Sequence, residues 1–222
     1  MAGAWEQRGR PNVLCGILHT EVTTLAWSFG LRNLQMPGDF LPVAGRPYDD
    51  ARNYCCEAVL NGPFSHLFFL DSDVIPPSDA VLKLLSRNLP VVSGVYFRRS
   101  HPHGHPVAIK RGAWLTPFKP NSLVEVDLVG AGCLLIRRDV IEQMKPQRPE
   151  AGKKWFDWRV DTAALKPPPD KPSLSEDFTF CHAIRMQMGI KTILDTSVIC
   201  RHAGFAEATY GAMGPLNTAV QT

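Results

Sequence analysis

Short apolar runs and segments of helical periodicity alternate along the first half of the chain. Each run is bounded by polar residues and is almost continuously apolar, as expected for a strand buried on both faces. The other segments carry apolar residues three and four positions apart, the spacing of an amphipathic helix. The predicted strands are 12–20, 66–70 and 90–97, and the predicted helices are 21–35, 48–62 and 79–88. This alternation predicts an α/β fold with a mostly parallel sheet flanked by helices.

Three local features of this half make sharper predictions. The stripe that would face the core from the first helix consists of Val22, Leu25, Ala26 and Phe29. Residues 37–47 contain several prolines and glycines, which predicts a loop. Ser78 stands where an N-cap is expected for the helix that follows it.

The second half of the chain combines shorter elements with one long loop. Prolines and charges dominate 145–173, which predicts a mobile loop of the length that often serves function. A helix is expected to begin at Ser175 and to end at Gly189. The remaining expectations are a short strand in 107–112, a strand, glycine turn, strand and short helix in 123–144, a last strand in 191–202, and a loose tail over 205–222. We expect 1–222 to form a single domain.

Composition narrows the class of protein. The chain has 222 residues, of which 45% are hydrophobic and 20% charged, with a formal net charge of +3. This balance is that of a globular protein, permits an anionic substrate and is too weak to indicate nucleic acid by itself. Six scattered cysteines without a C-x-x-C pair favour buried, reduced thiols. With neither a signal peptide nor a run of about 18 apolar residues, we expect a cytoplasmic protein without a membrane segment.

Two aspartates follow the strand at 66–70 directly. Ligands bind at the carboxyl ends of the strands in sheets of this type, and Asp71 and Asp73 stand at such an end. Carboxylates this close repel one another, and an oxygen-preferring cation such as Mg²⁺ or Mn²⁺ relieves that cost. The D-x-D pattern is weak alone, since about one match is expected by chance, and a solvated turn ended by prolines is the alternative. Neither a dinucleotide fingerprint nor a P-loop is present.

The surrounding segments strengthen this interpretation. The stretch "HLFFLDSDVIPPSDAVLKLL" resembles the D-x-D segment of GT-A fold glycosyltransferases, in particular the large inverting family that includes cellulose and chitin synthases. Four more segments match that family in the same order: "DDARNYCCEAVL", "VGAGCLLIRRDVIEQM", "SEDFTFCHAIRMQMG" and "ICRH". The resemblance covers roughly residues 12 to 204, and it implies a GT-A (Rossmann-like) fold. One departure is "LHTEVTT", which stands where the family usually has a proline-bearing turn.

The resemblance also implies residue roles. Asp73, Asp71 and His202 would be metal ligands for Mn²⁺ or Mg²⁺. Asp177 would take the proton from the acceptor hydroxyl, and Glu176 would orient the acceptor or support the site. The residues that would contact the nucleotide-sugar are Thr20, Glu21, Arg52, Asp71, Ser72, Arg98, Asp127, Gly130 and Gly132.

Several of these residues have structural explanations as well. Glu176 and Asp177 would favour the dipole of the helix that they begin, whatever their chemistry. A lone histidine such as His202 is often structural, and Arg52 fits a solvated helix face. Trp155 and Trp158 are equally suited to stacking on a sugar and to packing against the domain.

The sequence therefore predicts a metal-dependent glycosyltransferase that moves a sugar, with inversion, from a nucleotide-sugar to an acceptor hydroxyl. A UDP-sugar is the favoured donor. The acceptor stays open between a small molecule, a glycan, a protein and a hydroxylated DNA base; the cations in 98–112 favour DNA mildly. The alternatives are a nucleotidyltransferase, although "LHTEVTT" lacks a glycine-rich basic loop, and a non-catalytic module that binds sugar-nucleotides or carbohydrates.

Overall fold

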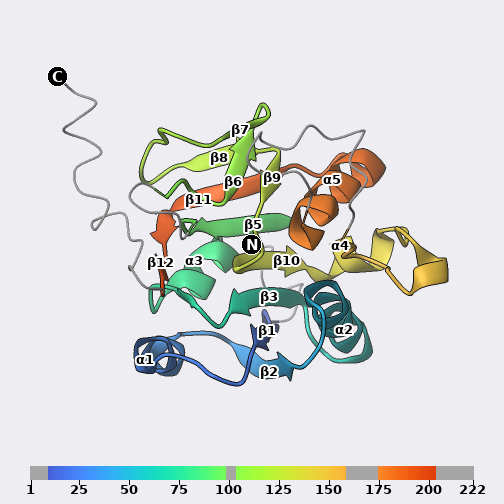
Figure 1. The fold of residues 1–222 in the computed structure, drawn as a ribbon, viewed down its shortest axis with the longest axis horizontal. Helices are drawn as coiled ribbons and strands as arrows, with labels where there is room; N and C mark the ends of the chain where they lie inside the picture. The colour runs from blue at the N-terminus through green and yellow to red at the C-terminus, as the bar shows by residue number, and fades with distance from the viewer. Residues whose placement is uncertain (1–9, 99–103, 159–174, 204–222) are drawn as a thin grey trace, which may run out of the picture.

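A seven-stranded sheet runs through the centre of the molecule in the computed structural model, with helices on both of its faces (Figure 1). The structure describes residues 10–98, 104–158 and 175–203. The strand order is β2-β1-β3-β10-β5-β11-β8. The bounds of these strands, in chain order, are β1 Val13–His19, β2 Gly38–Ala44, β3 His66–Asp71, β5 Val91–Val95, β8 Leu123–Val126, β10 Cys133–Arg137 and β11 Thr192–Ile199.

The directions of the strands confirm the mostly parallel sheet. β1 is parallel to both β2 and β3, and β5 is parallel to β11, while β10 is antiparallel to its two neighbours β3 and β5. Five strands therefore share one direction, and only β10 and β8 of this sheet oppose it. The carboxyl ends of β1, β3, β5 and β11 consequently meet at one edge, where ligands bind in such sheets.

Two hydrophobic cores cover the two faces of the sheet, and the strands supply them alternately. Along β3, for example, Leu67 and Phe69 belong to one core, and Phe68 and Leu70 to the other. This is the two-residue period of a strand buried on both sides. The first core packs against α2 (Tyr48–Asn61), α4 (Arg138–Gln143) and α5 (Glu176–Met188), and the second against α1 (Leu25–Asn33) and α3 (Ala80–Ser86).

Smaller strands complete the architecture around this edge of the sheet. β4 (Val74–Ile75) pairs with β12 (Arg201–His202), and this short ribbon follows directly on the aspartates after β3. β6 (Ala108–Lys110), β7 (Ala113–Trp114) and β9 (Leu128–Val129) form a separate three-stranded sheet. A 3-10 turn, Pro149–Ala151, follows α4. Among the described residues, each helix is too short or too polar to cross a bilayer.

Most predicted elements are present, but the loop predicted at 37–47 is wrong. Residues 38–44 form β2, the edge strand beside β1. An edge strand tolerates Pro42 because half of its N–H groups have no strand to pair with. Gly38 has φ +146°, and a Cβ there would lie 1.9 Å from the carbonyl oxygen of Val13, so close approach to β1 requires glycine.

The predictions for the first helix and for the cap of α3 also need correction. Thr24 accepts a hydrogen bond from the backbone of Trp27, so α1 begins only at Leu25. The buried residue of α1 is Trp27, whereas Val22, Leu25 and Phe29 of the predicted stripe are exposed. At α3 the N-cap position is Asp79 and not Ser78.

The beginning of the long segment predicted at 145–173 is packed against the domain. Trp155 is buried and donates its indole N–H to the carbonyl of Ile141 at 2.8 Å. Phe156 is also buried and stacks on Phe180 of α5, with ring centroids 4.5 Å apart. The remainder of this segment from 159, and the predicted tail at 205–222, lie outside the described residues. All six cysteines are buried and unpaired, as predicted.

Candidate functional site

The backbone from Asp71, the last residue of β3, to Asp73 is held by hydrogen bonds from three segments. The indole N–H of Trp27 donates to the carbonyl of Asp71 at 3.0 Å. The N–H of Ser72 donates to Leu18 at the end of β1, and the N–H of Ala203 donates to the carbonyl of Asp73. Because these contacts come from separate segments, the turn Asp71–Ser72–Asp73 has a fixed position at the edge where the carboxyl ends of the parallel strands meet.

A hollow of about 190 Å³ brings together residues that are far apart in the sequence. The turn after β3 forms one wall, and the start of α5, with Glu176 and Asp177, forms another. Arg52 of α2 also lines it. The lining residues are Leu18, Tyr48, Arg52, Asp71, Ser72, Asp73, Trp158, Glu176 and Asp177.

A second hollow, of about 360 Å³, adjoins the first and shares Leu18, Tyr48 and Ser72 with it. Thr20 and Glu21, which follow β1, line this second hollow. Ten residues line it: Leu18, His19, Thr20, Glu21, Val43, Gly45, Arg46, Tyr48, Ala51 and Ser72. Eight of the predicted site residues therefore line one or other of these adjoining hollows. They are Thr20, Glu21, Arg52, Asp71, Ser72, Asp73, Glu176 and Asp177.

Arg52 does not lie on a solvated helix face. Its side chain is 2% exposed and lies over the ring of Phe69, 4.9 Å from the centroid. Nε donates to Glu176 Oε1 at 2.9 Å, and Nη2 donates to Asp71 Oδ1 at 3.1 Å. Burial by itself lowers the pKa of a guanidinium, but the charges of Asp71, Glu176 and Asp177 outweigh it and raise the pKa of Arg52.

Glu176 is a buried carboxylate beside a second one. Burial, followed by the charge of Asp177, raises the pKa of Glu176 to about 7, although Arg52 opposes the rise. The group thus titrates close to neutrality in the folded protein.

Glu176→Gln should flatten the dependence of stability on pH. A glutamate whose pKa rises from 4.5 to about 7 on folding binds more protons folded than unfolded between these values. The folded state therefore loses stability as pH increases through this window, by at most about 1.4 kcal/mol per pH unit. Thermal unfolding of wild type and variant from pH 4.5 to 7 measures the difference.

Glu57→Gln is the matched control for this prediction, because it removes an exposed glutamate paired with Lys154. Its melting temperature should follow that of the wild type across the same window. Equal pH slopes for Glu176→Gln and wild type would contradict the prediction.

Asp177 is fixed by hydrogen bonds at the first turn of α5. Oδ1 accepts from the hydroxyl of Ser175 and from the N–H of Phe178, and Oδ2 accepts from the N–H of Ala131 at 3.3 Å. Oδ2 thus keeps capacity to accept a further proton donor.

His202 is oriented toward Asp73 by a backbone group. Its Nδ1 is hydrogen-bonded to the carbonyl of Phe97, and a carbonyl only accepts, so Nδ1 carries a proton. In the neutral imidazole, Nε2 then bears the lone pair, and it lies 3.4 Å from Asp73 Oδ1. Within the described residues, no group of three or more His, Cys, Asp or Glu side chains gathers closely enough to form a metal centre. Asp73 and His202 thus face one another as a pair.

The glycines expected to admit a sugar make room for Tyr96 instead. A Cβ on Gly130 would lie 2.0 Å from the Tyr96 hydroxyl oxygen, and one on Gly132 would lie 2.9 Å from Cζ of the same ring. The hydroxyl accepts a hydrogen bond from the N–H of Gly132 at 3.1 Å. This close packing is the physical reason for glycine at both positions.

Gly130→Ala should therefore destabilise the fold. Forcing a methyl group into this contact displaces a buried, hydrogen-bonded tyrosine, which costs about 1–3 kcal/mol. Chemical denaturation measures the loss. Gly112→Ala is the control for a glycine without neighbours, since nothing lies within 4 Å of its Cβ position; its cost should come from its positive φ alone. Unchanged stability in Gly130→Ala would show that Tyr96 relaxes freely.

Two other predicted residues lie elsewhere. Asp127 is paired with Arg185 of α5 and accepts a hydrogen bond from the backbone of Arg111, and it lines neither hollow. Arg98 lies over the ring of Trp114, 4.6 Å from its centroid. Trp114 in turn contacts Phe178, the neighbour of Asp177. Arg98 also lines neither hollow.

Sequence reasoning missed residues that have supporting roles. Tyr48, the first residue of α2, lines both hollows, and Trp27 and Tyr96 hold the turn after β3 and the glycine segment. A tyrosine at a helix start and a tryptophan within an apolar helix carry no pattern that marks a site. Trp158 is partly exposed and lines the smaller hollow, so of the two tryptophans considered it is the one available to a ligand.

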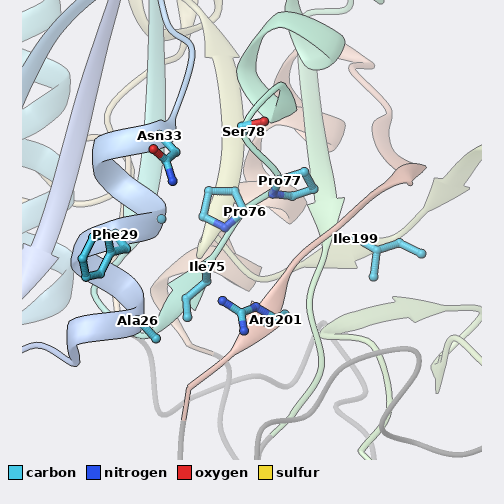
Figure 2. A pocket seen from close by; sticks show the side chains of 10 residues that line it. Ala26, Phe29, Asn33, Ile75, Pro76, Pro77, Ser78, Ile199 and Arg201 are labelled. Atoms are coloured by element: carbon cyan, nitrogen blue, oxygen red, sulfur yellow. The ribbon is translucent and has the colours of Figure 1, made fainter.

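A third hollow, of about 450 Å³, lies between α1 and the β4–β12 ribbon (Figure 2). Phe29 and Asn33 line it from the helix, and Ile75 and Arg201, which pair across the ribbon, line it from the other side. None of the predicted site residues lines this hollow.

Comparisons with known proteins give a relationship in structure only. No family model and no curated protein sequence matches the chain. Among solved structures, A197 from STIV superposes with a TM-score of 0.58 at 18% identity, covering 88% of this chain and 86% of that one. A structure of S. aureus TarS 1–349 in complex with UDP-GlcNAc matches with a TM-score of 0.46 at 10% identity, over 83% of this chain and 56% of that one.

The chain has a GT-A-like α/β fold. The sheet order, the five codirectional strands and the helices on both faces agree with the fold class predicted from the sequence. At 18% identity the likeness to A197 concerns the fold alone. Arguments about chemistry therefore rest on the residues in the hollows.

Proposed function

We propose that the chain is a glycosyltransferase that transfers a sugar from a nucleotide-sugar, preferably a UDP-sugar, to an acceptor hydroxyl with inversion. The observation that carries the proposal is the convergence of Asp71, Ser72 and Asp73 with Glu176 and Asp177 in one hollow. The aspartates after β3 and the acidic pair at the start of α5 come from segments more than a hundred residues apart. Their meeting supports the roles that the resemblance implies.

The metal fits this arrangement when the donor supplies part of the coordination. Asp73 and His202 would hold Mn²⁺ or Mg²⁺, a pairing of carboxylate and imidazole suited to Mn²⁺. Such ions commonly complete their shells with water and substrate phosphate oxygens. A bound ion would neutralise the charge that develops on the leaving diphosphate.

The residues of the chain perform the remaining tasks. The hollow beside Thr20 and Glu21 would receive the nucleoside, and the smaller hollow would receive the sugar. Asp177 accepts the proton from the acceptor hydroxyl, which attacks the anomeric carbon from the face opposite to the leaving group. The C–O bond to the diphosphate breaks as the new C–O bond forms, which inverts the configuration. Trp158, at the edge of the smaller hollow, would shield the sugar from water.

Thermal unfolding with nucleoside diphosphates and their sugars, with and without Mn²⁺, tests the proposal. A ligand that binds only the folded state raises the melting temperature. We expect stabilisation by UDP and a UDP-sugar that depends on Mn²⁺, followed by UDP release when the sugar donor is incubated with the protein. Binding without any release would indicate a non-catalytic module, and no stabilisation by any nucleotide would reject the function.

A further inference from the structure

Arg52 connects the two sides of the candidate site. Its helix, α2, lies beside both β1 and β3, and the guanidinium is buried between the end of β3 and the start of α5. One nitrogen donates to Asp71 and another donates to Glu176. The distances of 3.1 and 2.9 Å correspond to charge-assisted hydrogen bonds.

The third nitrogen of this guanidinium is unsatisfied. Among the described residues, Arg52 Nη1 is the one buried side-chain nitrogen or oxygen without a hydrogen-bond partner. An unsatisfied buried donor costs about 1–3 kcal/mol, and such exceptions in native proteins require an explanation.

Arg138 shows what a structural arginine looks like in the same protein. Its Nε pairs with Glu142 on the next turn of α4. Nη1 and Nη2 donate to the backbone at the end of α2 and the loop after it. The four carbonyl acceptors belong to Val59, Leu60, Gly62 and Phe64. The hydrogen bonds of Arg52, in contrast, go to two carboxylates from separate elements, Asp71 and Glu176.

Burial of the cluster of Arg52, Asp71 and Glu176 also lowers the stability of the folded state, because charged groups lose their hydration. Replacing a buried ion pair by apolar residues is often neutral or stabilising, so a buried cation between two carboxylates is weak support for a purely stabilising role. The planar fork of arginine, in contrast, fixes the direction of each partner, which a lysine cannot do.

We infer that Arg52 is a positioning residue that holds the donor side and the acceptor side of the site in one rigid frame. It fixes Asp71 beside the donor and Glu176 at the start of α5, and through Glu176 it sets the place of Asp177. This differs from the nucleotide contact implied by the resemblance. The inference rests on the proposed function, because it assigns Asp71 and Asp177 to the two halves of one reaction.

The test separates binding from turnover. In Arg52→Lys, which keeps the charge but loses the fork, we expect kcat for UDP release from a UDP-sugar to fall about 10²-fold, the loss typical of misplaced reacting groups. The Kd of UDP with Mn²⁺, measured by thermal shift, should change less than about threefold. Arg52→Gln, which can still donate to one carboxylate, serves if the lysine variant does not fold.

Arg138→Lys is the matched control, since it removes the fork of a structural arginine outside both hollows. It should lower the melting temperature without lowering kcat per folded molecule. A weaker Kd for UDP with retained kcat in Arg52→Lys would make Arg52 a nucleotide contact and overturn the inference. Equal retention of kcat in the Arg52 and Arg138 variants would make Arg52 structural and overturn it too. A wild-type protein that neither binds UDP nor releases it would reject the proposed function, and with it this inference.

Discussion

Asp177→Asn is expected to reduce sugar transfer by about 10²–10⁴-fold, the range that a positioned general base contributes. Asparagine has the size of aspartate, and its carbonyl oxygen can still accept from Phe178 and Ser175. The amide group, however, cannot take a proton from the acceptor. The loss should therefore appear in kcat, measured as release of nucleoside diphosphate. Either a sugar acceptor or water can serve as the attacking hydroxyl in this assay.

Donor binding should survive the same substitution, because Asp177 belongs to α5 and the donor is held by the segments after β1 and β3. The Mn²⁺-dependent rise in melting temperature with UDP provides that measurement. Asp195→Asn is the control, since Asp195 is a buried carboxylate paired with Arg87 and outside both hollows. If Asp177→Asn and the control Asp195→Asn had equal turnover, Asp177 would not be the general base.

The periodicity of the chain predicted the elements that form the site but not how they meet. β1, β3 and α5 were predictable because each combines a strong pattern with a clear boundary, such as Gly189 in the left-handed region at the end of α5. β2 was not predictable, because it contains Pro42 and proline is excluded only from central strands. The sequence alone does not indicate which strand lies at the edge of the sheet. The face of α1 was mispredicted for a related reason: the indole of Trp27 is anchored by a carbonyl 44 residues away.

The site shows the same division between local and long-range information. Asp71 and Asp73 were predicted from a local pattern, and Glu176 and Asp177 from the family resemblance; the structure brings all four together. The partners that orient them lie far away in the sequence, as Arg52 does from Glu176, 124 positions away. Gly130 was predicted to admit a sugar because glycine permits close approach of another group. The sequence does not show which group approaches, and in the structure it is Tyr96.

Asp73→Ala should remove most of the metal-dependent stabilisation by a nucleoside diphosphate. At a UDP concentration of about 100 times Kd, ligand binding stabilises the folded state by about 2.7 kcal/mol. Loss of one of the two facing ligands, with about 100-fold weaker binding, would leave about 0.4 kcal/mol. For a protein of this size, the shift in melting temperature would fall from about 5–10 °C to about 1 °C.

The metal dependence distinguishes this loss from a general defect of the fold. Asp79→Ala removes an exposed aspartate six positions further on, paired only across one helical turn with Lys83, and should keep the full UDP shift. His202→Gln should lie between the two, because Asp73 remains and the glutamine oxygen is a weaker ligand. If Asp73→Ala kept the wild-type shift with Mn²⁺, the turn after β3 would be a solvated end of a strand, and the acidic groups of the hollow would need another explanation. A shift lost in Asp73→Ala and kept in Asp79→Ala would instead show that the apolar run of β3 serves to place one carboxylate opposite His202 at the edge of the sheet.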